Sequence, residues 1–158
     1  MQLKLICVGK AKGALQELSR EYEKRIRRYA GLEVCELEEA KYRGSPNEAE
    51  AKQLLKREAA AIWRALEGRR RIVVLDAAGE SLTSLQFARH LEVCAVSGEG
   101  AIAFVIGGSL GLDPSIKEAA DMLLSLSAMT LPHQLARVVL LEQLYRAFTI
   151  LRREPYHK

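Results

Sequence analysis

The chain has 158 residues, a length at which one domain buries about 70% of the surface that its unfolded chain exposes. Hydrophobic residues make up 49% of it, and no low-complexity tract or repeat period is present, which excludes disordered, collagen-like and solenoid proteins. The formal net charge is +4, and arginines cluster within 25–28, 69–71 and 152–153. Such clusters suit a polyanion but are also common on solvated helices.

The three cysteines Cys7, Cys35 and Cys94 are scattered, so they predict neither a disulfide framework nor a metal site. No histidine spacing is typical of metal ligands or of a serine–histidine–aspartate set. The first residues lack the apolar core and the cleavage site of a signal peptide, and polar residues interrupt every long apolar stretch. We therefore expect a cytoplasmic protein that binds no metal and no membrane.

In chain order, the first half predicts two strand–helix units. Residues 2–8 form a short apolar run that Gly9 closes, and residues 15–29 carry apolar side chains at helical spacing. Residues 32–37 are predicted as the second strand.

The second helix has a start signal and a stop signal. Ser45 is expected as its N-cap, Pro46 at its first position, and Glu48 as the partner that completes a capping box. The helix should run to about Leu66 and end at Gly68.

The second half adds three more strand–helix units. Residues 76–79 are predicted as a loop, and Thr83 with Gln86 predicts a capped helix start. The predicted strands are 72–75, 101–106 and 122–126, and the other two helices begin at Asp113–Pro114 and at Pro132.

Strands that alternate with helices in this way indicate an α/β fold with a mostly parallel sheet flanked by helices. Ligands bind such sheets beyond the carboxyl ends of the strands, where the loops converge. The loops after Leu75, Ile106 and Leu126 are therefore predicted to share one site.

Two of these loops have suggestive compositions. Gly107 and Gly108 allow backbone groups to approach a ligand closely, but the loop matches neither GxGxxG nor GxxxxGK[ST], and paired glycines are often only a turn. The loop 127–132 offers small and hydroxyl residues that suit an adenine ring. A turn in which Ser127 or Thr130 caps the next helix explains them equally well.

The final helix is predicted to be apolar almost all round. Only Glu142, Arg146, Thr149 and Arg153 form a polar stripe, which is expected to stay in contact with water. Such a helix is either the interface of a two-fold homodimer or the central helix of one subunit.

The tail Pro155–Lys158 combines an aromatic ring, an imidazole and an amine. Beside Arg152 and Arg153, it is equipped to stack a nucleic-acid base and to contact phosphate, although exposed tails of this type can also be idle. His157 is therefore a candidate functional group. His133, at a helix start, is more often structural.

Three segments, IGGSLGL, LSLSAMTLPHQLARVVLLEQLYRAF and the terminal PYHK, resemble the RlmH (YbeA) family of ribosomal RNA methyltransferases, and the similarity covers the whole chain. The resemblance implies a SPOUT-type α/β knot, a single domain over 1–158, and a homodimer. The trefoil knot and the cofactor pocket would lie within about 100–158. Knots are nearly absent among protein folds, so this expectation rests on the resemblance alone.

The resemblance also implies methyl transfer from S-adenosylmethionine to N3 of a pseudouridine in 23S ribosomal RNA, on the assembled 70S ribosome and without a metal. The chain departs from the family at Leu110, where a polar or acidic residue is common. The loop 38–47 is variable, and no function is assigned to it. The cofactor-binding residues implied by the family motifs are Leu75, Gly107, Gly108, Ser127, Ala128, Met129, Thr130, Leu131 and Pro132.

Methyl transfer needs in-line alignment, and the target nitrogen must lose a proton. His157 is the candidate base because histidine titrates near neutrality, and Arg146 and Tyr156 are further catalytic candidates. We expect a composite active site in which the tail reaches the pocket of a partner subunit. The alternatives are a knot methyltransferase for transfer RNA or another ribosomal base, an idle RNA-binding factor, and a Rossmann-like nucleotide-binding protein, whose amino-terminal glycine fingerprint is absent.

Overall fold

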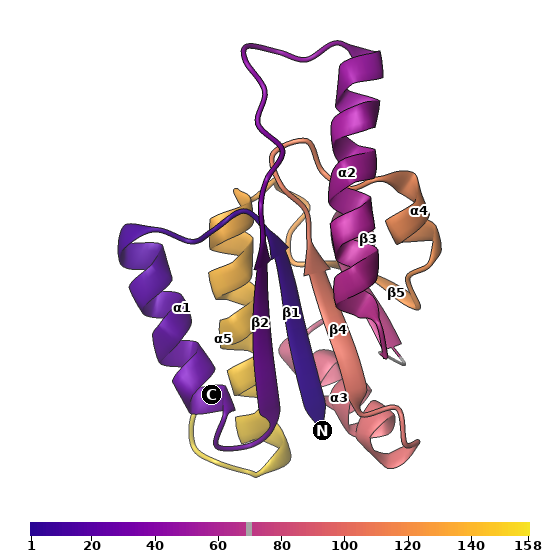
Figure 1. The fold of residues 1–158 in the computed structure, drawn as a ribbon. Coiled ribbons are helices and arrows are strands. Elements are labelled where there is room, and N and C mark those ends of the chain that lie inside the picture. Colours follow the sequence, from indigo (N-terminus) through magenta and orange to yellow (C-terminus); the bar gives the residue numbers. More distant parts are fainter. Residues whose placement is uncertain (69–70) are drawn as a thin grey trace.

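The protein is built on a five-stranded parallel sheet. The computed structural model describes residues 1–68 and 71–158, and within them the strands are β1 (Gln2–Val8), β2 (Gly31–Leu37), β3 (Arg71–Ser81), β4 (Ala101–Ile106) and β5 (Met122–Ser125). They are hydrogen-bonded in the order β2-β1-β4-β3-β5, and every pair is parallel (Figure 1). The predicted parallel α/β sheet is confirmed.

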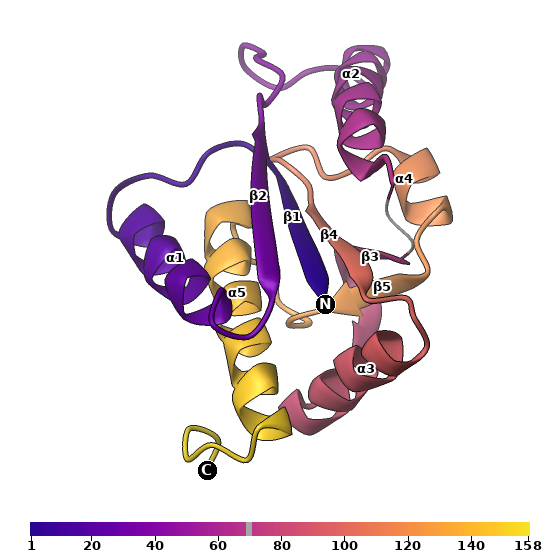
Figure 2. The same ribbon diagram turned by 60° about the horizontal axis from the view of Figure 1, so that its bottom comes forward.

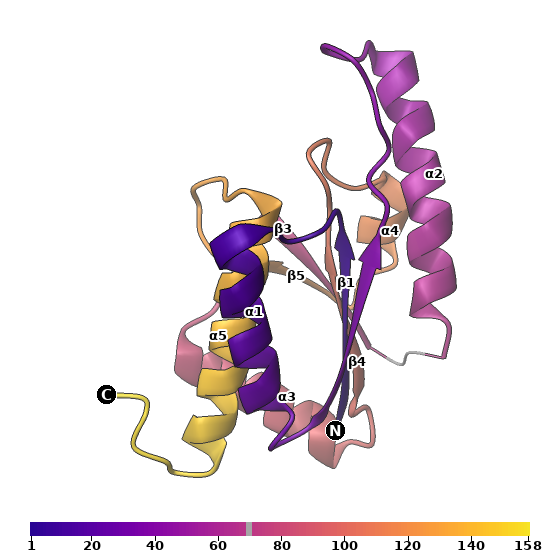
Figure 3. The same ribbon diagram turned by 60° about the vertical axis from the view of Figure 1, so that its left-hand side comes forward.

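Helices cover both faces of this sheet. They are α1 (Gly13–Ile26), α2 (Glu48–Leu66), α3 (Ser84–Val96), α4 (Pro114–Glu118) and α5 (His133–Leu151). Figure 2 and the edge-on view in Figure 3 show α1, α3 and α5 on one face and α2 and α4 on the other. The described residues therefore form three layers, with the sheet in the middle.

The inner strands β1 and β4 are buried on both faces. Along β1, Leu3 and Leu5 belong to the apolar cluster beneath α1, α3 and α5, whereas Ile6 and Val8 belong to the cluster beneath α2 and α4. The alternation follows because successive side chains of a strand point to opposite faces. For the same reason these strands read as continuous apolar runs in the sequence.

The start of α2 differs from the prediction. Asn47, not Ser45, is the N-cap: its side chain accepts a hydrogen bond from the amide of Glu50 at 2.9 Å, and the Glu50 carboxylate accepts one from the amide of Asn47 at 3.0 Å. Asparagine is as good an N-cap as serine, and here a glutamate follows it at the capping-box spacing. The predicted Ser45 cap was therefore wrong by two residues, while the predicted end at Leu66 is confirmed.

The segment 76–79, predicted as a loop, lies within β3 but departs from its ladder. Leu75 and Glu80 both register with Leu124 of β5, so the residues between them bulge out of the sheet. Gly79 makes the return possible, because a Cβ atom there would lie 2.5 Å from the carbonyl oxygen of Leu123. Bulges of this kind re-aim nearby side chains and are common beside functional sites.

The helix α5 is the central helix of its layer, which is one of the two alternatives expected from the sequence. It packs against α1, α3 and β4 (Figure 2), which bury most of its apolar side chains. Thr149 is also fully buried, so its predicted contact with water was wrong; its hydroxyl is satisfied by the carbonyl oxygen of Arg146 at 2.7 Å. Leu135 remains 37% exposed. The homodimer stays a prediction.

Several of the clustered arginines form ordinary surface ion pairs. Arg25 lies 2.9 Å from Glu21, and Arg27 lies 3.6 Å from Glu23, both at the i,i+4 spacing of a helix. In the cluster 69–71, Arg69 and Arg70 lie outside the described residues. Two of the three arginines in the cluster 25–28 are therefore explained without a nucleic acid.

The described ranges hold neither a helix that could cross a membrane nor a cluster of metal ligands. None of their helices is long and apolar enough to cross a membrane. Nor do the described side chains include a group of three or more histidine, cysteine, aspartate or glutamate residues that could hold a metal ion.

Candidate functional site

A cavity of about 230 Å³ lies beyond the carboxyl ends of the strands. Its walls come from the bulged part of β3, from the ends of β4 and β5 and the loops that follow them, from α4 and from the first turn of α5, so the three predicted segments do share one site. Ala128 and Pro132 belong to the same loop but do not line the cavity. The predicted cofactor residues that line it are Leu75, Gly107, Gly108, Ser127, Met129, Thr130 and Leu131.

The cavity also has charged lining residues that the sequence did not reveal. Lys117 of α4 lies 2.6 Å, through Nζ, from Oδ2 of Asp76. The hydrogen bond from Lys117, together with one from the amide of Ala78, holds the pKa of Asp76 below its ordinary value. Asp76 could have been found, since it directly follows Leu75. Lys117 had no signal, because α4 matches no ligand-binding pattern.

Close packing explains the glycines of the loop after β4. A Cβ atom on Gly107 would lie 2.5 Å from the carbonyl oxygen of Gly111, and one on Gly108 would lie 3.0 Å from Cγ1 of Val8. Gly111 has a φ of +84°, which favours glycine, and its amide donates to the carbonyl of Gly108 at 3.1 Å. Side chains would therefore push this loop out of its place beside the cavity.

The loop between β5 and α5 is stabilised by its own hydroxyl groups. Oγ of Ser125 lies 3.1 Å from the carbonyl oxygens of both Ala77 and Ser127, and Oγ of Ser127 accepts a hydrogen bond from the amide of Met129 at 3.0 Å. Neither Ser127 nor Thr130 caps α5, whose N-cap is Pro132 and has no side-chain hydrogen bond. The capped-helix alternative is therefore wrong, although Ser127 does stabilise a turn. Met129 is 71% exposed at the rim.

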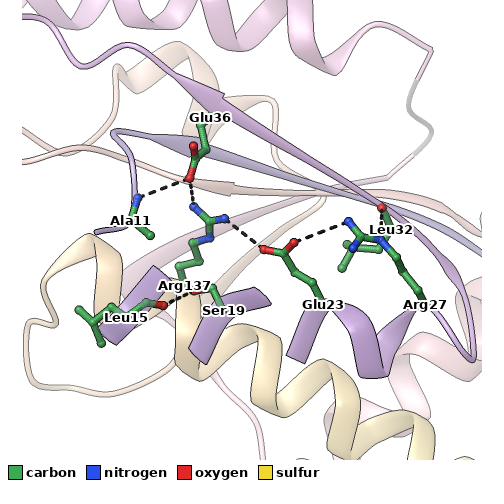
Figure 4. Close-up of polar contacts among 8 residues, drawn as sticks. All are labelled: Ala11, Leu15, Ser19, Glu23, Arg27, Leu32, Glu36 and Arg137. Carbon is green, nitrogen blue, oxygen red and sulfur yellow. Dashed lines mark hydrogen bonds and ion pairs between the residues drawn. The ribbon is translucent and has the colours of Figure 1, made fainter. Parts of the chain in front are cut away.

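A buried arginine fixes the amino-terminal half of α5, whose first turn forms one wall of the cavity. Arg137 donates to Glu23 of α1 at 3.1 Å and also to Glu36 of β2 (Figure 4). Burial alone would raise the pKa of Glu36, but the hydrogen bond and charge of Arg137 outweigh it and leave the pKa below its ordinary value. The position of His133 and Ala136, which line the cavity, is thereby fixed relative to α1 and β2.

Two of the three predicted catalytic residues meet at the other end of α5. The hydroxyl of Tyr156 donates to Oε1 of Glu142 at 3.0 Å, and Nε of Arg146 lies 3.0 Å from the same oxygen. The Arg146 guanidinium also lies 4.8 Å from the centre of the Tyr156 ring. Burial raises the pKa of Tyr156, and hydrogen bonds with Tyr22 and Glu142 raise it further. Tyr156 is therefore a neutral phenol at neutral pH.

The third candidate, His157, is partly buried next to Tyr156. Its Nδ1 atom is buried and has no hydrogen-bond partner among the described residues. Buried polar atoms without a hydrogen-bond partner are rare in folded proteins.

Within one chain, the catalytic candidates and the cavity are far apart. Ala136 lines the cavity, and Arg146 lies ten residues further along α5, which corresponds to roughly 15 Å along the helix axis. In Figure 1 the arrows of β1, β2 and β4 point upward, and α5 runs the opposite way, down to the carboxyl-terminal tail. The structure therefore does not bring His157, Arg146 and Tyr156 to the cofactor candidates of the same chain.

The chain matches the family model described as "Predicted SPOUT methyltransferase" over residues 1–157. It is 46% identical to the ribosomal RNA large subunit methyltransferase H of Streptococcus equi subsp. zooepidemicus, over the full length of both proteins. It is 45% identical, again over both full lengths, to the protein of the same name from Acetivibrio thermocellus. These relatives confirm the resemblance noted in the sequence.

Solved structures share the fold at low identity. A probable methyltransferase from Bordetella pertussis matches 93% of this chain and 96% of its own, with a TM-score of 0.56 and 15% identity. TrmJ from Z. mobilis matches 100% of this chain and 73% of its own, with a TM-score of 0.57 and 13% identity. Together with the family model and the full-length relatives, they show that the chain belongs to the SPOUT methyltransferase family.

Proposed function

We propose that the protein is an S-adenosylmethionine-dependent methyltransferase that acts on the large-subunit ribosomal RNA. Its full-length likeness to relatives named ribosomal RNA large subunit methyltransferase H, at 46% identity, carries this proposal. The finer assignment, N3 of a pseudouridine in 23S RNA of the assembled 70S ribosome, extends what the family resemblance implies. A ribosomal substrate also supports action in the cytoplasm.

The lining of the cavity suits the chemistry of S-adenosylmethionine. Leu75, Leu124 and Leu131 supply an apolar wall for the adenine ring, and the close-packed backbone after β4 supplies amides and carbonyls for polar edges. The charged pair of Asp76 and Lys117 offers both an acceptor and a donor. We propose that the cofactor is held by the lining residues expected from the sequence, namely Leu75, Gly107, Gly108, Ser127, Met129, Thr130 and Leu131. Ala128 and Pro132, also expected from the sequence, would complete the loop without lining the cavity.

The bound cofactor would supply an electrophilic methyl group, and the protein would align it with the target nitrogen. We assign the deprotonation of that nitrogen to His157, because its buried Nδ1 has no partner in the described chain and an imidazole nitrogen can accept a proton. Arg146 would contact phosphate, and the Tyr156 ring would stack on a base. Glu142 holds both of these side chains.

The distance between tail and cavity supports a composite site. A chain whose catalytic candidates lie roughly 15 Å along α5 from its own cavity needs a second subunit to bring the two together. We propose a two-fold homodimer in which the tail of each subunit reaches the cavity of its partner. The trefoil knot implied by the resemblance also remains a proposal.

Methylation assays with labelled S-adenosylmethionine would test the function. We expect label in 23S RNA when 70S ribosomes from a strain without this modification are supplied, and mass spectrometry should place the methyl group on N3 of a pseudouridine. Label in transfer RNA or on another base would indicate a different methyltransferase of the same fold. Calorimetry that detects no binding of S-adenosylmethionine would leave an idle RNA-binding factor instead.

A further inference from the structure

Glu39 lies in the variable loop after β2, a segment to which the sequence assigned no function. Its Oε1 atom accepts a hydrogen bond from the amide of Ser109 at 2.7 Å, and the same oxygen would lie 2.8 Å from a Cβ atom on Gly108. Gly108 lines the cavity. The carboxylate of Glu39 therefore packs directly against the glycine loop from the side of β2.

A second side chain of the same loop contacts the same residue. The hydroxyl of Tyr42 lies 2.9 Å from Oγ of Ser109. Ser109 is thus held through its amide by Glu39 and through its hydroxyl by Tyr42. The loop after β2 therefore holds the loop after β4 in place, even though β1 lies between these strands in the sheet.

The other oxygen of Glu39 faces the start of α5. A Cβ atom on Gly9 would lie 3.5 Å from Oε2 of Glu39 and 3.0 Å from Nε2 of His133, so these two side chains flank Gly9. His133 is the first residue of α5 and lines the cavity. Burial alone would raise the pKa of Glu39, but hydrogen bonds from Ser109 and the charge of His133 leave it below its ordinary value.

We propose that Glu39 is a positioning residue for the cofactor pocket, one that fixes the backbone of Gly108 and Ser109 in its binding conformation. The inference rests on the proposed cofactor site. A glycine loop is flexible when free, and ordering it on binding costs affinity. A charge-assisted hydrogen bond from a carboxylate to a backbone amide restrains the loop in advance, so the cofactor meets a preformed wall.

The test compares Glu39→Met, which removes the acceptor but keeps the length of the side chain, with Glu39→Gln, which keeps an acceptor oxygen. Titration calorimetry with S-adenosylmethionine should show a Kd about tenfold higher for Glu39→Met, since hydrogen bonds to charged groups are the strong ones. Glu39→Gln should recover most of the affinity. Glu38→Gln is the matched control, because Glu38 is exposed and pairs only loosely with Lys41, at 3.9 Å.

The outcomes separate this inference from the proposed function. Wild-type protein that does not bind S-adenosylmethionine would contradict the proposed function itself. Wild-type protein that binds, together with Glu39→Met that binds equally well, would overturn the role of Glu39 alone. If Glu39→Met does not fold, Tyr42→Phe tests the same contact between the two loops by removing a hydroxyl from an exposed side chain. We expect its Kd to be about threefold higher. An unchanged Kd in that variant would also overturn the inference.

Discussion

Arg137 of α5 donates to Glu23 of α1 across 3.1 Å, and both side chains are almost fully buried. The pair joins residues 114 positions apart in the chain, and Glu36 completes it from β2 (Figure 4). A buried charge that loses its partner costs several kcal/mol. We expect Arg137→Met to lower the free energy of unfolding by about 3 kcal/mol, measured by urea denaturation.

The control for this variant is Arg27→Met. Arg27 lies 3.6 Å from the same glutamate, but its side chain is 51% exposed, so its loss should cost at most about 0.5 kcal/mol. Equal destabilisation by the two substitutions would contradict a special role for the buried pair.

The contact between Arg137 and Glu36 predicts that the stability of the protein depends on pH. In the wild type the pKa of Glu36 lies below its ordinary value of 4.5, so its contribution to stability is present above pH 4.5 and is lost as the pH falls through the folded-state pKa. In Arg137→Met the pKa of Glu36 rises relative to the wild type, because burial is then opposed only by the amide of Ala11 and the charge of Lys10, so acid relieves the cost of the partly buried carboxylate. Urea denaturation at several pH values should show the stability gap between the two proteins narrowing below about pH 4.5. A stability difference that stays constant at all pH values would show that protonation of Glu36 is not linked to its contact with Arg137.

The sequence predicted the sheet well because each inner strand is an apolar run and each connection is a helix. It predicted which residues line the cavity where the apolar run of a strand ends, as at Leu75 and Gly107. It could not place Glu39 or Lys117 beside the cavity, because strand order decides which loops meet, and β1 lies between β2 and β4. Nor did residue types distinguish Asn47 from Ser45 as a cap; the side-chain hydrogen bonds decide between them.

The thiol of Cys7 should be unreactive in the native protein. Burial raises its pKa to about 12, although the charge of Arg137 acts in the opposite direction. Cys94 is buried as well, and Cys35 is only partly buried. With a disulfide reagent near pH 8, we expect one thiol to react quickly and two to react only on unfolding. The fast phase should disappear in Cys35→Ser. A fast phase that persists there would mean that Cys7 or Cys94 is accessible.

Gly107→Ala should distort the cofactor wall. The new Cβ atom would lie 2.5 Å from a backbone oxygen of Gly111 and 2.8 Å from Cγ of Leu112, and backbone cannot move aside cheaply. We expect the Kd for S-adenosylmethionine to rise by more than about tenfold, because misplaced backbone groups lose their contacts with the ligand. Gly100→Ala, before the start of β4, is the control: its nearest neighbour would be 3.6 Å away, an ordinary contact. Equal affinities in the two variants would contradict the proposed position of the cofactor.

Mixing two inactive variants would decide whether the active site is composite. Gly107→Ala is expected to disable the cavity, and His157→Ala the tail. If the tail of each subunit serves the cavity of its partner, a mixed dimer contains one site with both defects and one intact site. Random mixing in equal amounts, after dissociation and reassociation, should therefore restore about a quarter of the wild-type methylation. If tail and cavity of the same chain worked together, each subunit of a mixed dimer would still carry a defect. No activity would then return. This outcome would contradict the composite site and indicate an active site formed within one chain.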